Sequence, residues 1–203
     1  MKFKSISFTG VDGAGKSTII ALLENYIGKQ NVIIQYMGSR CYESKIAVKY
    51  IENNKSNSIL MDVLKIFVFI YEMYYRVWKL RNTSKLIIFD RYVDEKYISL
   101  KKNHNIGAKF LLYFYYVFFG ILFHKPDVTF YLTCPVEFSL KRKDDIVSDK
   151  DKDKLLKNKR LMDNYYINRK NTITIDTSIY TIDETLNKIV CELNQRKILL
   201  NYE

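Results

Sequence analysis

The chain has 203 residues, of which 48% are hydrophobic and 27% charged, so it can bury the core of one folded domain without disulfides. Its formal net charge of +11 comes mainly from lysines scattered along the chain. A nucleic-acid-binding protein clusters its basic residues, so we expect no nucleic-acid partner. The cysteines Cys41, Cys134 and Cys191 show no CxxC spacing, which argues against a disulfide framework or a zinc site. Because the N-terminus carries no export signal, we expect a cytoplasmic protein.

Predicted strands and helices alternate along the whole chain. Short apolar runs are typical of buried strands, and apolar residues three or four positions apart are typical of one helix face. In chain order the patterns predict strands over 3–10, 32–37, 86–89, 128–132 and 173–175, and helices over 19–27, 46–51, 58–81 and from 181 onward. Thr181 and Glu184 form a capping box at the start of the last helix. This alternation predicts a single α/β domain over residues 1–203, with a five-stranded parallel sheet and helices on both faces.

Residues 110–123 form an aromatic run that is too short for a membrane span, which needs ~20 apolar residues. We expect a buried or dimer-interface helix here, and peripheral contact with a membrane surface is the alternative. In a homodimer the interface would include residues three or four positions apart on one face: Tyr113, Tyr116, Val117 and Gly120.

The segment Gly10–Ser17 matches the phosphate-binding pattern G-x-x-x-x-G-K-[ST] between a predicted strand and a predicted helix. Such a loop directs backbone N–H groups and a helix N-terminus at phosphate oxygens. Lys16 is expected to reach the β- and γ-phosphates of ATP, and the Ser17 hydroxyl to bind Mg²⁺. The fold is therefore expected to be the three-layer P-loop NTPase fold. The predicted ATP-binding residues of the loop are Gly10, Asp12, Gly13, Ala14, Gly15, Lys16, Ser17 and Thr18.

Asp90 and Arg91 follow the third predicted strand, at the sheet edge where α/β proteins bind ligands. Asp90 is expected to hold Mg²⁺ through water. Arg91 can bridge phosphate oxygens with its planar fork of donors. We predict Lys16, Arg91, Asp90 and Asp12 as the catalytic residues.

Three motifs in this order resemble those of the thymidylate kinase family. They are Gly10–Thr18, the Asp-Arg-Tyr sequence at 90–92, and the run from Lys125 to Arg142, which contains both prolines of the chain, Pro126 and Pro135. The resemblance implies transfer of the γ-phosphoryl group of ATP, with Mg²⁺, to a nucleoside monophosphate, most readily dTMP, by a homodimeric enzyme.

The resemblance also implies roles for further residues. Asp12 corresponds to the family aspartate that approaches the acceptor sugar, Arg40 to an acceptor-phosphate ligand, and Arg76 to the arginine that contacts the acceptor. Arg91 is expected to contact the acceptor as well. Arg142 would contact the bound nucleotide at the start of a charged lid over about residues 142–160, which closes to exclude water.

Departures from the family pattern leave the acceptor open. Residues 93–99 differ from the usual continuation, and Glu72 stands where an aromatic ring often stacks on thymine. One alternative is a phosphotransferase of the same fold that acts on a nucleoside or another small molecule. That reaction needs a carboxylate base near the second strand, where the sequence offers only Glu43, in a poor position. The other alternative is a nucleotide-binding regulatory or membrane-associated protein that docks through residues 110–123.

Overall fold

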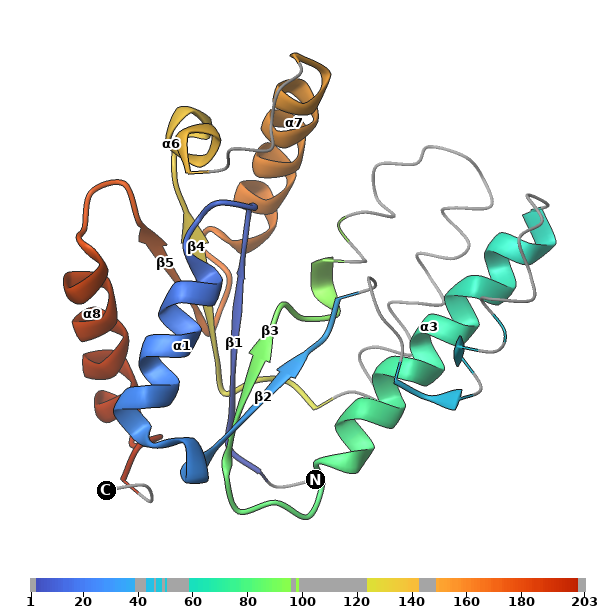
Figure 1. The fold of residues 1–203 in the computed structure, drawn as a ribbon, viewed down its shortest axis with the longest axis horizontal. Coiled ribbons are helices and arrows are strands. Elements are labelled where there is room, and N and C mark those ends of the chain that lie inside the picture. Colours follow the sequence, from blue (N-terminus) through green and yellow to red (C-terminus); the bar gives the residue numbers. More distant parts are fainter. Residues whose placement is uncertain are drawn as a thin grey trace. The chain divides into compact units, whose positions relative to one another are not determined.

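The computed structural model describes residues 3–38, 43–45, 47, 48, 50, 59–95, 98, 124–142 and 149–200. Five strands form one sheet in the order β2-β3-β1-β4-β5, and every neighbouring pair is parallel (Figure 1). The predicted five-stranded parallel sheet is therefore confirmed. The strands are β1 (Ser5–Gly10), β2 (Val32–Tyr36), β3 (Leu86–Asp90), β4 (Val128–Thr133) and β5 (Thr172–Asp176).

The centre of the sheet forms the core of the molecule. Every residue of β1 is buried, and Phe8 of β1 stacks on Phe130 of β4 with ring centroids 5.2 Å apart. The strand register places Phe8 opposite Asp90 of β3 on one side and opposite Phe130 on the other. The carboxyl ends of β3, β1 and β4 therefore lie at the same edge of the sheet, which is where parallel α/β sheets place their ligand sites.

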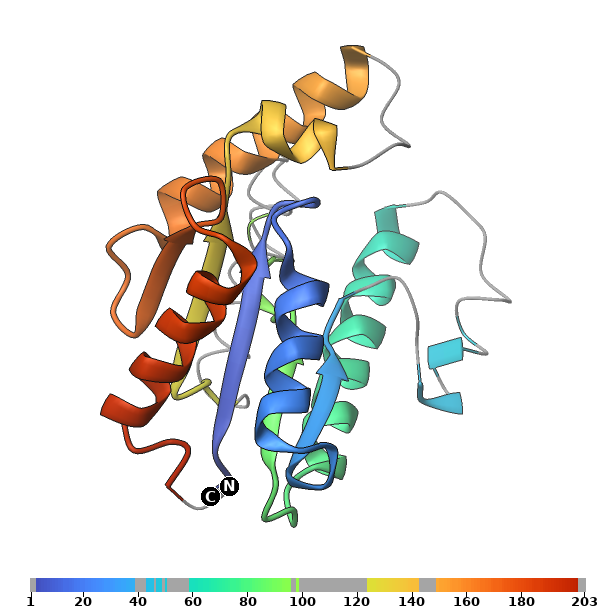
Figure 2. The same ribbon diagram turned by 60° about the vertical axis from the view of Figure 1, so that its left-hand side comes forward.

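Helices α1 (Lys16–Ile27) and α8 (Ile182–Gln195) pack against each other and lie in front of the strands in Figure 2. Gly28 ends α1 with a φ of 93°, a conformation that glycine adopts at no steric cost. The predicted capping box of α8 is confirmed: the Glu184 N–H donates to Thr181 Oγ1, and the Glu184 carboxylate accepts the Thr181 N–H. The short helix α6 (Val136–Lys141) follows β4, and α7 (Asp149–Tyr166) precedes β5.

The chain forms two compact units. One consists of residues 1–2, 37–83 and 93–125, and the other of residues 3–36, 84–92 and 126–203, which include the whole sheet. The first unit contains the long helix α3 (Ile59–Lys79). The predicted aromatic run over residues 110–123 and the predicted ligand Arg40 lie outside the described residues.

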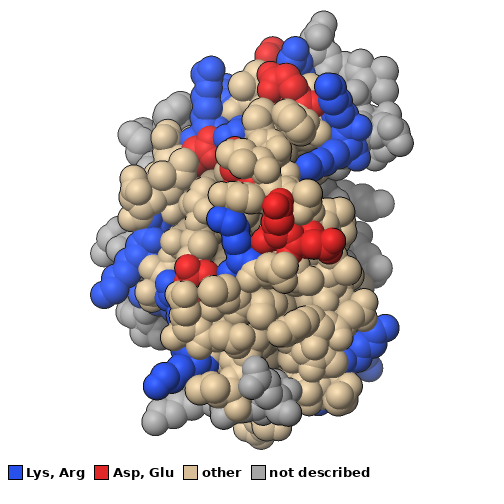
Figure 3. Space-filling model, turned by 90° about the vertical axis from the view of Figure 1, so that its left-hand side faces the viewer, with Lys and Arg blue, Asp and Glu red and all other residues tan. Residues whose placement is uncertain are grey.

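Charged side chains of both signs are interspersed on the face that Figure 3 shows, where single Lys and Arg groups alternate with Asp and Glu between broad uncharged areas. No helix within the described ranges combines the length and apolar character that crossing a membrane requires.

Candidate functional site

The loop between β1 and α1 contains two glycines, Gly10 and Gly13, at which neighbouring elements leave no room for a side chain. A Cβ atom at Gly10, which has a φ of 148°, would lie 2.0 Å from the carbonyl oxygen of Leu132 on β4. A Cβ atom at Gly13, with a φ of 84°, would lie 2.6 Å from Ser139 Oγ on α6. Both positions therefore need glycine for backbone conformation and for close packing. The loop packs closely against β4 and α6.

The N-terminus of α1 has the features of an anion site. No side chain caps the helix, and its first turn contains no acidic residue. A Cβ atom at Gly15, the residue before α1, would meet no atom within 4 Å. The backbone N–H groups of the first turn have no acceptor within the helix, and the positive end of the helix dipole lies there. This arrangement fits phosphate oxygens.

Lys16 lies at the start of α1 and folds back onto its own loop. Its Nζ donates to the carbonyl oxygens of Gly10 at 2.7 Å and Val11 at 2.8 Å, and the side chain is buried. These carbonyls keep the ammonium group beside the backbone that the pattern predicts to bind phosphates. Ser17 and Thr18, the next two residues of the motif, are exposed in the first turn of α1.

Arg91 is ion-paired with Asp12 of the phosphate loop. Its Nη2 donates to Asp12 Oδ1 at 2.5 Å, and both side chains are partly exposed. Its backbone N–H donates to the carbonyl of Phe8 at 2.8 Å, while its φ of 66° is in the left-handed region that few non-glycine residues occupy. Such strain persists where the surroundings impose it and often accompanies function. Two predicted catalytic residues are thus brought into direct contact.

Asp90, the last residue of β3, directly precedes Arg91 and lies opposite Phe8 of β1. A carboxylate at this edge and the hydroxyl of Ser17 are the oxygen donors that Mg²⁺ accepts when substrate phosphates and water supply its remaining ligands. The residue types therefore fit the predicted metal, and the assignment of Asp90 and Ser17 as its ligands stays a prediction.

Ser139 and Thr177 are contacts of the loop that sequence reasoning missed. The buried Ser139 hydroxyl on α6 donates to the carbonyl of Asp12, and Thr177 Oγ1 after β5 donates to the carbonyl of Ala14 at 3.3 Å. The predicted nucleotide contact Arg142 also binds Thr177: its Nη2 donates to the Thr177 carbonyl at 2.9 Å. Arg142 thus joins α6 to the chain after β5, beside the phosphate loop.

Helix α7, which carries most of the predicted lid, is tied to β4 near its C-terminal end. The hydroxyl of Tyr131 donates to Asp163 Oδ1 at 2.6 Å, Lys159 Nζ donates to Asp163 Oδ2 at 2.6 Å, and the rings of Tyr131 and Tyr166 stack at 5.1 Å. Burial and the neighbouring Asp163 raise the pKa of Tyr131 far above its ordinary value, so the phenol stays a donor. The helix extends beyond the predicted lid boundary at residue 160 to Tyr166.

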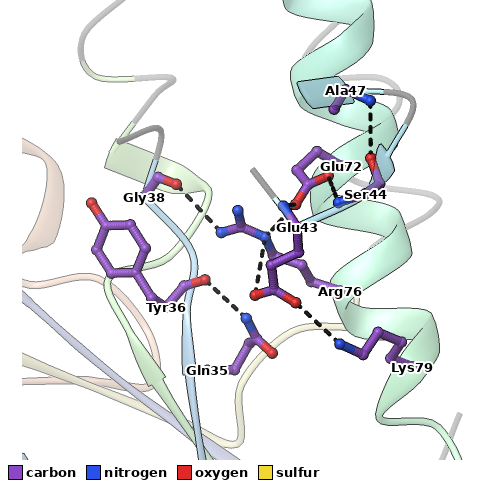
Figure 4. Close-up of polar contacts among 9 residues, drawn as sticks. All are labelled: Gln35, Tyr36, Gly38, Glu43, Ser44, Ala47, Glu72, Arg76 and Lys79. Carbon is purple, nitrogen blue, oxygen red and sulfur yellow. Dashed lines mark hydrogen bonds and ion pairs between the residues drawn. The ribbon is translucent and has the colours of Figure 1, made fainter. Parts of the chain in front are cut away.

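Arg76, the predicted acceptor contact on α3, is buried and belongs to an ion-pair cluster of the first unit, in which Glu72 is also buried and Glu43 and Lys79 are partly exposed (Figure 4). Its Nε donates to Glu72 Oε1 at 2.8 Å and lies 3.6 Å from Glu43 Oε1, and Lys79 donates to the other oxygen of Glu43 at 3.1 Å. Burial alone would raise the pKa of Glu72, but donors from the backbone of Glu43, from Ser44 and from Arg76 hold this pKa below its ordinary value. Glu72 is therefore a carboxylate at neutral pH.

Comparison with known proteins identifies a family for this chain. A family model described as thymidylate kinase matches residues 8–189. The thymidylate kinase of Thermoanaerobacter sp. (strain X514) is 28% identical over 148 residues, which cover 70% of this chain and 71% of the relative. The thymidylate kinase of Mycoplasma mobile (strain ATCC 43663 / 163K / NCTC 11711) is 27% identical over 146 residues, which cover 68% and 69%.

Solved structures of low sequence identity share the fold. The thymidylate kinase of Candida albicans matches with a TM-score of 0.66 at 20% identity, covering 100% of this chain and 94% of that one. A deoxyadenosine kinase from M. mycoides, solved with dCMP and dCDP products, matches with a TM-score of 0.62 at 19% identity, covering 94% and 99%. The expected P-loop NTPase fold is thus confirmed.

Proposed function

The chain belongs to the thymidylate kinase family, and from this premise we propose that it transfers the γ-phosphoryl group of ATP to a nucleoside monophosphate, with dTMP as the preferred acceptor. It is accordingly a nucleotide kinase. The observation that carries the proposal is the uncapped N-terminus of α1 behind the glycine loop, with the Arg91–Asp12 pair beside it. We expect the enzyme to act in the cytoplasm.

In the proposed reaction, the loop N–H groups and Lys16 bind the donor phosphates, and Arg91 bridges donor and acceptor oxygens. Ser17 and Asp90 would hold Mg²⁺, which would neutralise phosphate charge. Asp12 orients Arg91 through their ion pair and approaches the acceptor sugar, while Arg142 contacts the donor nucleotide. Because an acceptor phosphate is already ionised at pH 7, catalysis consists of positioning and charge stabilisation, with no general base.

The experiment that tests this function is an ADP-release assay over a panel of acceptors. We expect dTMP to give the highest kcat/KM, other nucleoside monophosphates to give lower values, and nucleosides to give none above the ATPase background. Activity on nucleosides with none on monophosphates would instead support the nucleoside alternative. Glu43 is then the base to test, although its carboxylate is paired with Lys79.

We further propose that the enzyme is a homodimer, and helix α3 supports a contact surface for it. Five large apolar residues on α3 are exposed and recur alternately three and four positions apart, as in a helix–helix seam: Leu64, Phe67, Tyr71, Tyr74 and Trp78. Burying one such side chain contributes ~1.5–3 kcal/mol, so several across a two-fold axis stabilise a pair.

Sedimentation at micromolar concentration, with and without lipid vesicles, tests the dimer. We expect a dimer that stays in solution when vesicles are pelleted, and a monomer after replacement of Tyr71 and Tyr74 by Glu. A wild-type monomer that pellets with vesicles would instead favour the membrane-associated alternative.

A further inference from the structure

We propose that Glu72 is a positioning residue for acceptor binding, which acts by fixing the guanidinium of Arg76 and the chain at Glu43–Ser44 in one arrangement. The inference rests on the proposed function, and in particular on the proposed contact between Arg76 and the acceptor. It adds a residue to that site and assigns a use to the position at which the chain departs from its family's pattern.

The Glu72 carboxylate accepts hydrogen bonds from three N–H groups at once (Figure 4). Its Oε1 accepts the backbone N–H of Glu43 at 2.6 Å and Arg76 Nε at 2.8 Å, while its Oε2 accepts the backbone N–H of Ser44 at 3.0 Å. The side chain is fully buried, and a buried carboxylate is stable only when such donors compensate its charge. One side chain therefore links two turns of α3 to the chain that follows β2.

Arg76 contacts two points of the chain that follows β2. Its Nη1 donates to the carbonyl of Gly38 at 3.4 Å, and its Nε is shared between Glu72 and, at 3.6 Å, Glu43. Ser44, whose N–H binds Glu72, in turn accepts the N–H of Ala47 on its hydroxyl at 3.2 Å. Gly38 and Glu43, two points of the chain that follows β2, thus both contact Arg76.

Among the described residues, Glu43 and Glu72 face Arg76 and Lys79. Glu72 holds Arg76 in a fixed direction through its contact with Nε. A guanidinium directed in this way contributes hydrogen-bond geometry to a ligand, and geometric precision of this kind governs binding and reaction. A purely structural pair would affect both substrates alike, whereas a positioning pair affects the acceptor that Arg76 contacts.

Two substitutions and one matched control test the role. Glu72→Gln keeps the size of the side chain but replaces one acceptor oxygen by a donor, so it cannot accept all three N–H groups. Glu72→Asp keeps the charge on a shorter arm. Glu192→Gln removes the Glu192–Arg196 pair, which has the same i,i+4 spacing and the same Nε contact but lies exposed at the end of α8.

We expect Glu72→Gln to raise KM for the acceptor by about tenfold or more, with KM for ATP within twofold of wild type. Glu72→Asp should be intermediate and Glu192→Gln should equal wild type. An acceptor KM within twofold of wild type in both Glu72 variants would overturn the proposal. So would a parallel rise of both KM values with a lower Tm, because that result marks a structural role. If Glu72→Gln does not fold, Glu72→Asp alone decides the comparison.

Amide hydrogen exchange separates this inference from the proposed function. In the wild-type chain the N–H groups of Glu43 and Ser44 should be protected, and in the folded Glu72 variants they should exchange faster while β1 stays protected. Unchanged exchange at both amides would show that Glu72 does not fix the chain at Glu43–Ser44, whatever the enzyme's substrate. If the wild-type protein phosphorylates no nucleoside monophosphate but its Glu72 variants lose this amide protection, the acceptor role and the proposed function are rejected. The conclusion that Glu72 fixes the chain at Glu43–Ser44 is then retained.

Discussion

Two arginine–carboxylate pairs in this molecule have the same chemistry and opposite surroundings. Arg91 and Asp12 come from positions 79 residues apart, meet at 2.5 Å and are partly exposed. Arg76 and Glu72 are one helical turn apart on α3, meet at 2.8 Å and are fully buried. The first pair belongs to the phosphate loop, and the second also satisfies backbone N–H groups.

The contrast shows that an ion pair affects stability differently at the solvent-exposed surface and in the core. An exposed pair contributes little stability, about 0–1 kcal/mol, because solvent screens it. Removing one partner of a buried pair costs far more, because an uncompensated charge remains. We therefore expect substitutions at the phosphate loop to reduce the rate of transfer with little loss of stability, and substitutions in the α3 cluster to destabilise the fold.

The largest expected effect is on the loop side. Lys16→Ala should reduce kcat to below about one thousandth of wild type, because the donor phosphates lose their main positive charge. The fold should survive, since Lys16 contacts carbonyl oxygens of its own loop. The measurement is single-turnover transfer with a thermal unfolding control. A variant that keeps most of the wild-type rate would show that the proposed donor site is wrong.

Arg76→Met should have the next largest effect, which is a loss of stability. It leaves the buried carboxylate of Glu72 without its cation, so we expect a loss of about 3–5 kcal/mol in the free energy of unfolding, measured by denaturant titration. The double variant with Glu72→Leu, which removes both charges, should recover part of that loss. If Arg76→Met is as stable as wild type, the distinction between the two pairs fails.

Arg91→Lys should show the reverse behaviour. Lysine keeps the charge but lacks the planar fork that holds two oxygens, so kcat should fall by on the order of 10²-fold. Stability should change by less than about 1 kcal/mol, because the pair is partly exposed and both residues meet the same strain at a φ of 66°. An unchanged kcat would confine Arg91 to a structural role.

Local patterns in the sequence predicted the elements that local physics determines. The five strands, the helix terminator Gly28 and the Thr181–Glu184 capping box are each encoded within a few residues, and each is confirmed. The glycine loop was predicted for the same reason. The approach of β4 and α6 to Gly10 and Gly13, however, is a contact between segments far apart in the sequence, which no local pattern predicts.

The parts that sequence reasoning missed join distant residues. Ser139 binds Asp12 across 127 positions and Thr177 binds Ala14 across 163, and an isolated serine or threonine gives no signal of such a contact. Glu72 is different, because a glutamate four residues before an arginine on a helix predicts a pair.

The smallest expected effect is the pH dependence of the stability that Glu72 of the buried pair contributes. Glu72 has a pKa held below its ordinary value of 4.5 in the folded state, since its N–H donors and Arg76 outweigh burial. Its contribution to stability is therefore complete above the unfolded pKa and is lost as pH falls through the folded pKa. We expect wild type to have a higher Tm than Glu72→Gln at pH 7, and the gap to narrow as pH falls below about 4.5. The exposed Glu184, whose pKa is lowered by Thr181, titrates in both proteins, so its effect cancels in the difference. A gap that stays constant down to pH 3 would mean that the charge of Glu72 does not stabilise the fold, and the contrast between the two pairs would then reduce to their exposure alone.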